Sequence, residues 1–192
     1  MIGGNLEYLM TSLPNLSFQD TPEARSRVSA TLKKYAGPAA EGKSLIDILC
    51  DEAEKFLTPG TRVLLRQINL NTIYHPTCRQ SKNGVLSAFS NYMFSLKKAV
   101  RKLRMERRKD DRQASSQKQL LPLTPGTPLE EEIQLLKMQW DKLEELSIGH
   151  YADFGALIIY KLKLMILLRW WSFDTNKGFE TFIRLTKSIE HG

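Results

Sequence analysis

The densest concentration of charge in the chain lies between Lys97 and Arg112. This basic segment holds nine basic and three acidic residues, a net charge of +6 out of the +7 of the whole 192-residue chain. Such a cluster can bind nucleic-acid phosphates, anionic lipid headgroups or an acidic protein surface. Because acidic residues are interleaved, an ordinary solvated helix face is the alternative. The candidate partner-binding residues are Lys97, Lys98, Arg101, Arg104, Arg107 and Arg108.

Residue patterns for catalysis or metal binding are missing from the sequence. It has no glycine-rich phosphate loop, no Gly-x-Ser-x-Gly elbow and no His-Glu-x-x-His pair. The histidines His75, His150 and His191 are too scattered for a metal site. His150 and Asp153 are expected on one helical face as a hydrogen-bonded structural pair. We therefore expect no catalytic, metal-binding or cofactor-binding residues, and a protein that is not an enzyme.

The composition is that of a globular protein from a reducing compartment. Hydrophobic residues make up 42% and charged residues 26%, which excludes a wholly disordered or collagen-like chain. Two cysteines, Cys50 and Cys78, do not make a disulfide framework. The first residues lack the basic and apolar regions of a secretory signal, so the expected location is the cytoplasm.

Hydrophobic spacing predicts helices almost throughout the chain. The expected ranges are about 6–13, 21–37, 44–57, 61–74, 85 into the basic segment, 127–146 and 154–171, with a final helix carrying Phe179, Phe182, Ile183 and Ile189. Alternating apolar residues near 6–10 and 68–74 would also suit short strands. The predicted fold class is all-α, a compact bundle of about six or seven helices with one long basic helix.

Two further features concern how the helices are arranged. Residues 110–126 are polar, then Pro- and Gly-punctuated, and predict a flexible loop or hinge within a single helical domain of residues 1–192. After them, Thr127-Pro128-Leu129-Glu130 predicts a capping box. The range 154–171 is broken by charges after at most seven residues, so we expect a buried helix rather than a membrane span. Trp170 and Trp171 at its end favour core packing over an interface.

Three blocks of sequence resemble a known family. The first is residues 5–18, which read NLEYLMTSLPNLSF. The second comprises Leu129-Glu130, Leu135-Leu136, Trp140, residues 143–146, residues 149–151 and Asp153; the third comprises Ala156-Leu157, Tyr160, residues 162–164, residues 166–167 and Arg169-Trp170. On these blocks the chain resembles an uncharacterised bacterial protein family encoded in V-type ATPase operons. That family is similar to a shortened form of the V/A-type ATPase socket protein, the all-helical component between the rotating shaft and the membrane ring.

The resemblance implies a non-catalytic subunit or accessory protein that links the central stalk of the ATPase to its membrane rotor. Expected partners are the central-stalk subunits and the membrane ring, with no small-molecule substrate, and ATP hydrolysis belongs to the partner subunits. The expected location is cytoplasmic, at the inner membrane only through the complex. The socket protein is considerably longer and has three similar helical units, whereas this chain has room for about two.

Two alternatives remain open. The chain could be a helical nucleic-acid-binding protein that uses residues 97–112, although no aromatic residue lies between Leu96 and Leu121 to stack on bases. It could also be an assembly factor that touches the ATPase only transiently.

Overall fold

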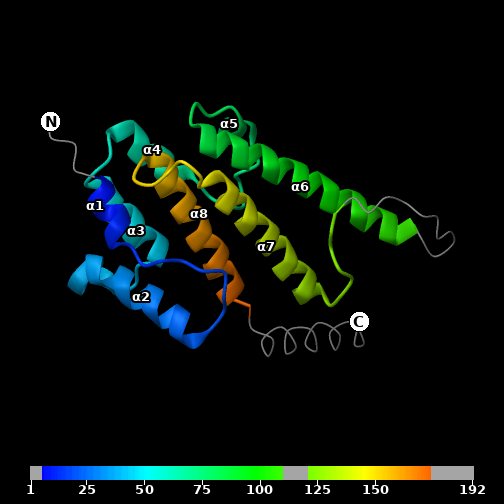
Figure 1. Ribbon diagram of the computed structural model, residues 1–192, viewed down its shortest axis with the longest axis horizontal. Coiled ribbons are helices and arrows are strands. Elements are labelled where there is room, and N and C mark those ends of the chain that lie inside the picture. Colours follow the sequence, from blue (N-terminus) through cyan, green and yellow to red (C-terminus); the bar gives the residue numbers. More distant parts are fainter. Residues whose placement is uncertain (1–5, 110–120, 174–192) are drawn as a thin grey trace, which may run out of the picture.

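The computed structural model describes residues 6–109 and 121–173, which form helices and connections between them (Figure 1). These residues contain eight α-helices, one turn of 3₁₀ helix and no strand, so the predicted all-α fold with one long basic helix is confirmed. The four-residue helix α5, which lies in none of the expected ranges, brings the number above the six or seven expected. The elements are α1 (Leu6–Ser12), α2 (Pro22–Ala36), η1 (Gly37–Ala40), α3 (Leu45–Glu54), α4 (Pro59–Gln67), α5 (Pro76–Arg79), α6 (Gly84–Lys109), α7 (Pro128–Leu146) and α8 (Phe154–Trp171).

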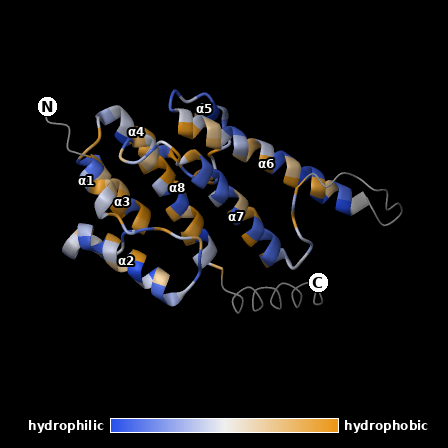
Figure 2. Ribbon diagram, viewed as in Figure 1, coloured by the Kyte–Doolittle hydropathy of each residue, from blue (hydrophilic) through white to orange (hydrophobic). Residues whose placement is uncertain are grey.

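The central element of the fold is α8, which packs against α1, α3, α6 and α7. Most of its side chains are buried, which confirms the prediction of a buried helix at residues 154–171. A helix that is apolar on nearly every side buries its apolar surface only when other helices surround it. In Figure 2, hydrophobic residues gather where the helices face one another, whereas the distal half of α6 is largely hydrophilic. None of the helices described is both long and apolar enough to cross a membrane.

Side-chain caps explain where five of the helices begin. In each case an oxygen of the N-cap side chain accepts a hydrogen bond from a backbone N–H three residues on, as the first turn requires. The predicted capping box is present: Thr127 Oγ1 accepts from the Glu130 N–H at 3.3 Å, and Glu130 Oε2 accepts from the Thr127 N–H at 2.7 Å. The five N-cap residues are Thr21, Ser44, Asn83, Thr127 and Asp153.

The segment between α1 and α2 is held along α8. The Tyr160 hydroxyl donates to the Pro14 carbonyl at 2.8 Å, and Trp171 Nε1 donates to the Gln19 carbonyl at 3.0 Å. Phe18 stacks on Trp170 with ring centroids 4.3 Å apart. The expected packing of the two tryptophans against the core is therefore confirmed.

The prediction of a helix over residues 61–74 is wrong in its second half. Helix α4 begins earlier, at Pro59, and ends at Gln67. The Asn69 side chain accepts a hydrogen bond from the Asn71 N–H at 2.9 Å, which gives the backbone a turn in place of another helical residue. Ile73, in the turns that follow, is buried, and its carbonyl accepts a hydrogen bond from the Ser90 hydroxyl of α6.

Part of the predicted loop at 110–126 packs against the body. Leu121 and Leu123 are buried in a small cluster with Leu96 of α6 and Leu135 of α7. Residues 110–120 and the expected final helix, with Phe179, Phe182, Ile183 and Ile189, lie outside the described residues. A single domain over residues 1–192 with a hinge at 110–126 stays a prediction.

Candidate functional site

Residues 97–109 of the basic segment form the distal part of α6. In Figure 1 this end of α6 extends beyond the body formed by the other helices. Its inner face carries Leu96, Val100 and Leu103, which pack in the small cluster with Leu121 and Leu135. Because this part of α6 packs through one face, Lys98, Arg101, Lys102, Arg104 and Met105 on its other positions are exposed.

Two of the six candidate residues make contacts within the fold. The Lys97 ammonium lies 3.5 Å from the centre of the Tyr74 ring, a cation–π contact. Arg107 Nη1 donates to both carboxylate oxygens of Glu131, at 2.7 and 2.9 Å. These contacts join α6 to the turn before α5 and to the first turn of α7. Arg108 belongs to α6, but its side chain is outside the described part of the chain.

Three of the candidates form the free cationic surface of α6. The side chains of Lys98, Arg101 and Arg104 are exposed. Among residues 6–109 and 121–173, the only acidic partner of a cation between positions 97 and 106 is Glu106, which lies 3.7 Å from Lys102. The attraction that these three cations exert is therefore not offset by a carboxylate in the part of the chain that the structure describes.

Sequence reasoning missed two apolar residues on the same surface. Phe94 and Met105 keep 41% and 49% of their surface exposed, although the core-facing residues of α6 around them are buried or half-buried. Both are out of phase with the inner face of α6 formed by Met93, Leu96 and Val100. That phase difference is the signal in the sequence that could have identified them as outward-facing.

A groove of about 290 Å³ is lined in part by the Lys97 side chain. Leu70, Met93 and Leu135 contribute to its apolar lining. Its rim carries Arg169, which donates to Glu132 at 2.7 Å. The cationic charge of this rim is therefore partly compensated, unlike that of the outer surface of α6.

The predicted pair of His150 and Asp153 exists, but not on a helix. Both residues lie in the connection between α7 and α8, with His150 Nδ1 2.6 Å from Asp153 Oδ2. Asp153 Oδ1 also accepts from the Ala156 N–H at 2.8 Å. Burial opposes ionisation, but these hydrogen bonds and the nearby imidazole hold the pKa of Asp153 below its usual value. The pair is thus part of the N-cap of α8.

A buried lysine is the second feature that the sequence did not reveal. Lys161 is only 2% exposed, and its ammonium donates to the Leu65 carbonyl at 2.5 Å. The Cys50 thiol is close enough to interact with the ammonium electrostatically. Burial lowers the pKa of Lys161 and raises the pKa of Cys50, because a charged form of either group is poorly solvated there. The contact ties α8 to the end of α4.

The described ranges hold no group of three or more His, Cys, Asp and Glu side chains placed to bind a metal ion. The free cysteines are Cys50, which is buried, and Cys78, which is half-buried.

The chain was compared with known protein families, curated proteins and solved structures. A family described as a protein of unknown function (DUF2764) matches residues 112–192, which include α7 and α8. The chain is therefore similar to this family over less than half of its length. No curated protein and no solved structure matches the chain.

Proposed function

We propose that this protein is a non-catalytic subunit or accessory protein of a bacterial V/A-type proton- or sodium-translocating ATPase. It would link the central stalk to the membrane rotor in the manner of the socket protein, on the cytoplasmic side and at the membrane only through the complex. The sequence resemblance of residues 5–18 and of the blocks in α7 and α8 motivates the identity of the complex.

The observation that carries a docking role is the free cationic surface of α6. Lys98, Arg101 and Arg104 lie within two helical turns, are exposed and have no carboxylate partner among the described residues. Cations in such an arrangement raise the rate of encounter with an acidic partner and fix its orientation. Because this part of α6 extends beyond the body, a partner can approach it without displacing any of the helices that the structure describes (Figure 1).

The first experiment is co-elution of the protein with the central-shaft proteins of the same operon in size-exclusion chromatography at moderate salt. We expect a stable complex with the wild-type chain and its loss in the variant Lys98→Glu/Arg101→Glu/Arg104→Glu. Separate elution of the wild-type chain at micromolar concentration would contradict the central-stalk role.

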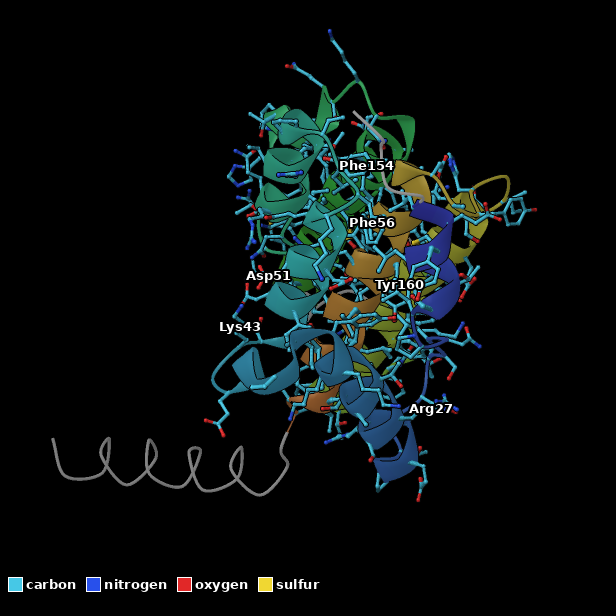
Figure 3. The ribbon with its side chains drawn as sticks, turned by 90° about the vertical axis from the view of Figure 1, so that its left-hand side faces the viewer. Arg27, Lys43, Asp51, Phe56, Phe154 and Tyr160 are labelled. Carbon is cyan, nitrogen blue, oxygen red and sulfur yellow. The ribbon has the colours of Figure 1, made fainter. Side chains whose placement is uncertain are left out.

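A matched control is available on α2. Arg27, Lys33 and Lys34 are exposed, and Figure 3 shows Arg27 extending from α2 at the end of the molecule away from α5. The variant Arg27→Glu/Lys33→Glu/Lys34→Glu changes the net charge by the same amount, so it should still co-elute. Loss of the complex in both variants would indicate that overall charge, and not the α6 surface, governs binding.

Nucleic acid is tested with the same variants. Binding of duplex or single-stranded probes that falls steeply with salt and depends on Lys98, Arg101 and Arg104 would favour the nucleic-acid alternative. Absence of nucleic-acid binding at low salt would exclude the nucleic-acid alternative.

A further inference from the structure

Four exposed residues of α6 form one line, which we call the outer seam. They are Phe94, Lys98, Arg101 and Met105, at spacings of four, three and four residues. This is the 3-4 spacing with which one helix meets another side by side. At 1.5 Å per residue the outer seam is about 16 Å long, or three helical turns.

The outer seam is not a part of the core of this protein. The inner face of the same turns, with Leu96, Val100 and Leu103, packs against Leu121, Leu123 and Leu135. Phe94 and Met105 keep 41% and 49% of their surface exposed. Two large apolar side chains therefore stand at the ends of the outer seam with two cations between them.

The Phe94 end of the outer seam is held in place by its neighbours. The Arg79 guanidinium lies 4.1 Å from the centre of the Phe94 ring. Arg79 Nε also donates to Asn91 Oδ1 at 2.9 Å, so the guanidinium is anchored to α6 one turn before Phe94. A ring covered by a fixed guanidinium on one side offers its remaining surface as a defined apolar contact with a positive rim.

We propose that the outer seam of α6 binds an acidic amphipathic helix of a partner protein. Apolar side chains of that helix pack on Phe94 and Met105, and its carboxylates face Lys98 and Arg101, with Arg104 beside them. This inference rests on the proposed function, because it names the structural element of the partner protein that binds to the same surface of α6.

Charge and spacing favour a helix over the other anionic partners. A helix that lies in a membrane interface needs a continuous apolar face, whereas here two cations interrupt the apolar residues. A nucleic-acid backbone supplies no apolar surface for Met105. A helix with leucine-like residues at 3-4 spacing and glutamates beside them satisfies the apolar and the cationic positions together.

The test uses the full chain and a synthetic probe. The probe is a fluorescent, stapled helical peptide of about 15 residues, long enough to cover the outer seam, with Leu at 3-4 spacing and Glu at the flanking positions. Anisotropy is measured with the wild-type chain and with Phe94→Ser/Met105→Ser and Lys98→Glu/Arg101→Glu. We expect each double variant to bind about tenfold more weakly or worse, since one removes both apolar contacts and the other reverses both cationic contacts of the outer seam. Val63→Ser is the matched control, because Val63 is 57% exposed on α4.

A charge swap guards against variants that merely fold poorly. A peptide with Lys in place of Glu should not bind the wild-type chain but should bind Lys98→Glu/Arg101→Glu. Equal binding of a proline-broken peptide of the same composition would overturn the proposal, because charge alone would then suffice. No binding of the acidic helix, or Phe94-dependent binding of anionic phospholipid vesicles in its place, would also overturn it.

The result separates this inference from the proposed function. If the acidic helix binds but the central-shaft proteins do not co-elute, the outer seam serves a different complex. If the shaft proteins co-elute equally well with Phe94→Ser/Met105→Ser, the ATPase role stands and the outer seam is not its docking site.

Discussion

Arg107 on α6 donates both of its short hydrogen bonds to Glu131 on α7, and this ion pair fixes the distal end of α6 to the start of α7. Glu131 lies in the first turn of α7, where a carboxylate is also favoured by the helix dipole. Arg107, a candidate partner-binding residue, therefore has a role inside the fold, as Lys97 does beside the Tyr74 ring. A charge reversal that includes Arg107 changes the protein's own packing as well as its surface.

The two roles predict different effects on stability. Arg107→Glu places a carboxylate beside Glu131, and we expect the free energy of unfolding to fall by about 0.5–1 kcal/mol, as for a partly exposed ion pair. Arg104→Glu should stay within about 0.5 kcal/mol of the wild type, because no described carboxylate contacts Arg104. Urea unfolding measures both. The swap Arg107→Glu/Glu131→Arg should recover the loss, and equal effects of the two single variants would contradict this assignment.

The N-cap of α8 gives a second prediction. Asp153→Ala removes the acceptor of the Ala156 N–H, and we expect a loss of about 1 kcal/mol in the free energy of unfolding. Asp153→Asn keeps an oxygen in that place and serves as the matched control, since asparagine is an equally good N-cap. A loss of the same size in both variants, measured in urea at neutral pH, would assign the effect to the contact with His150 instead.

The same residue predicts a dependence on acid. Its folded pKa is lower than the unfolded value of 3.8, so the unfolded chain takes up this proton first as the pH falls. The contribution of Asp153 to stability is thus present above pH 3.8 and is lost progressively as the pH falls from there through the folded pKa. Asp153→Asn should show a shallower decline over this range in denaturant titrations at several pH values.

Local signals were sufficient to predict most of the helices. Thr21-Pro22, Ser44 and Thr127-Pro128 mark helix starts because cap and proline act through neighbouring backbone groups, without help from the rest of the fold. The end of α4 was missed because the Asn69 turn competes with a helical pattern that continues to Tyr74. Apolar spacing does not report such a competition.

From the sequence, the candidate site could be predicted only as a run of basic residues. The sequence locates the basic segment, but Lys97 and Arg107 find their partners Tyr74 and Glu131 through tertiary packing. The burial of Lys161 is likewise decided by helices that are distant in sequence, because its acceptor is the Leu65 carbonyl. Whether the side chains of Phe94 and Met105 are exposed depends on which face of α6 packs against the core.

Lys161 gives a further prediction, which concerns the sign of a change in stability. Burial lowers its pKa, which means that the fold disfavours the charged ammonium. The Leu65 carbonyl also accepts from the Ile68 N–H at 3.3 Å, so it keeps a donor without the lysine. We therefore expect Lys161→Met, which fills a similar volume, to be at least as stable as the wild type in urea unfolding. Lys161→Ala should lose about 2–5 kcal/mol through the cavity it leaves.

A stabilised Lys161→Met together with a destabilised Lys161→Ala would show that the position needs volume rather than charge. Losses of equal size in both variants would instead show that the hydrogen bond to Leu65 dominates.

Tyr160 links the N-terminal segment to α8 and predicts a response to alkali. Its hydroxyl donates to the Pro14 carbonyl, and burial raises its pKa far above the usual value of 10. The folded protein therefore keeps a proton that the unfolded chain releases above pH 10, so the free energy of unfolding should fall as the pH rises beyond that point.

The variant Tyr160→Phe should cost about 1 kcal/mol at neutral pH through the lost hydrogen bond. Its free energy of unfolding should decline less steeply above pH 10 than that of the wild type. Urea unfolding at neutral and alkaline pH measures both effects, with Tyr8→Phe as the control because Tyr8 is 69% exposed. Parallel declines in the wild type and Tyr160→Phe would mean that the Tyr160 hydroxyl ionises as readily in the folded protein as in the unfolded chain.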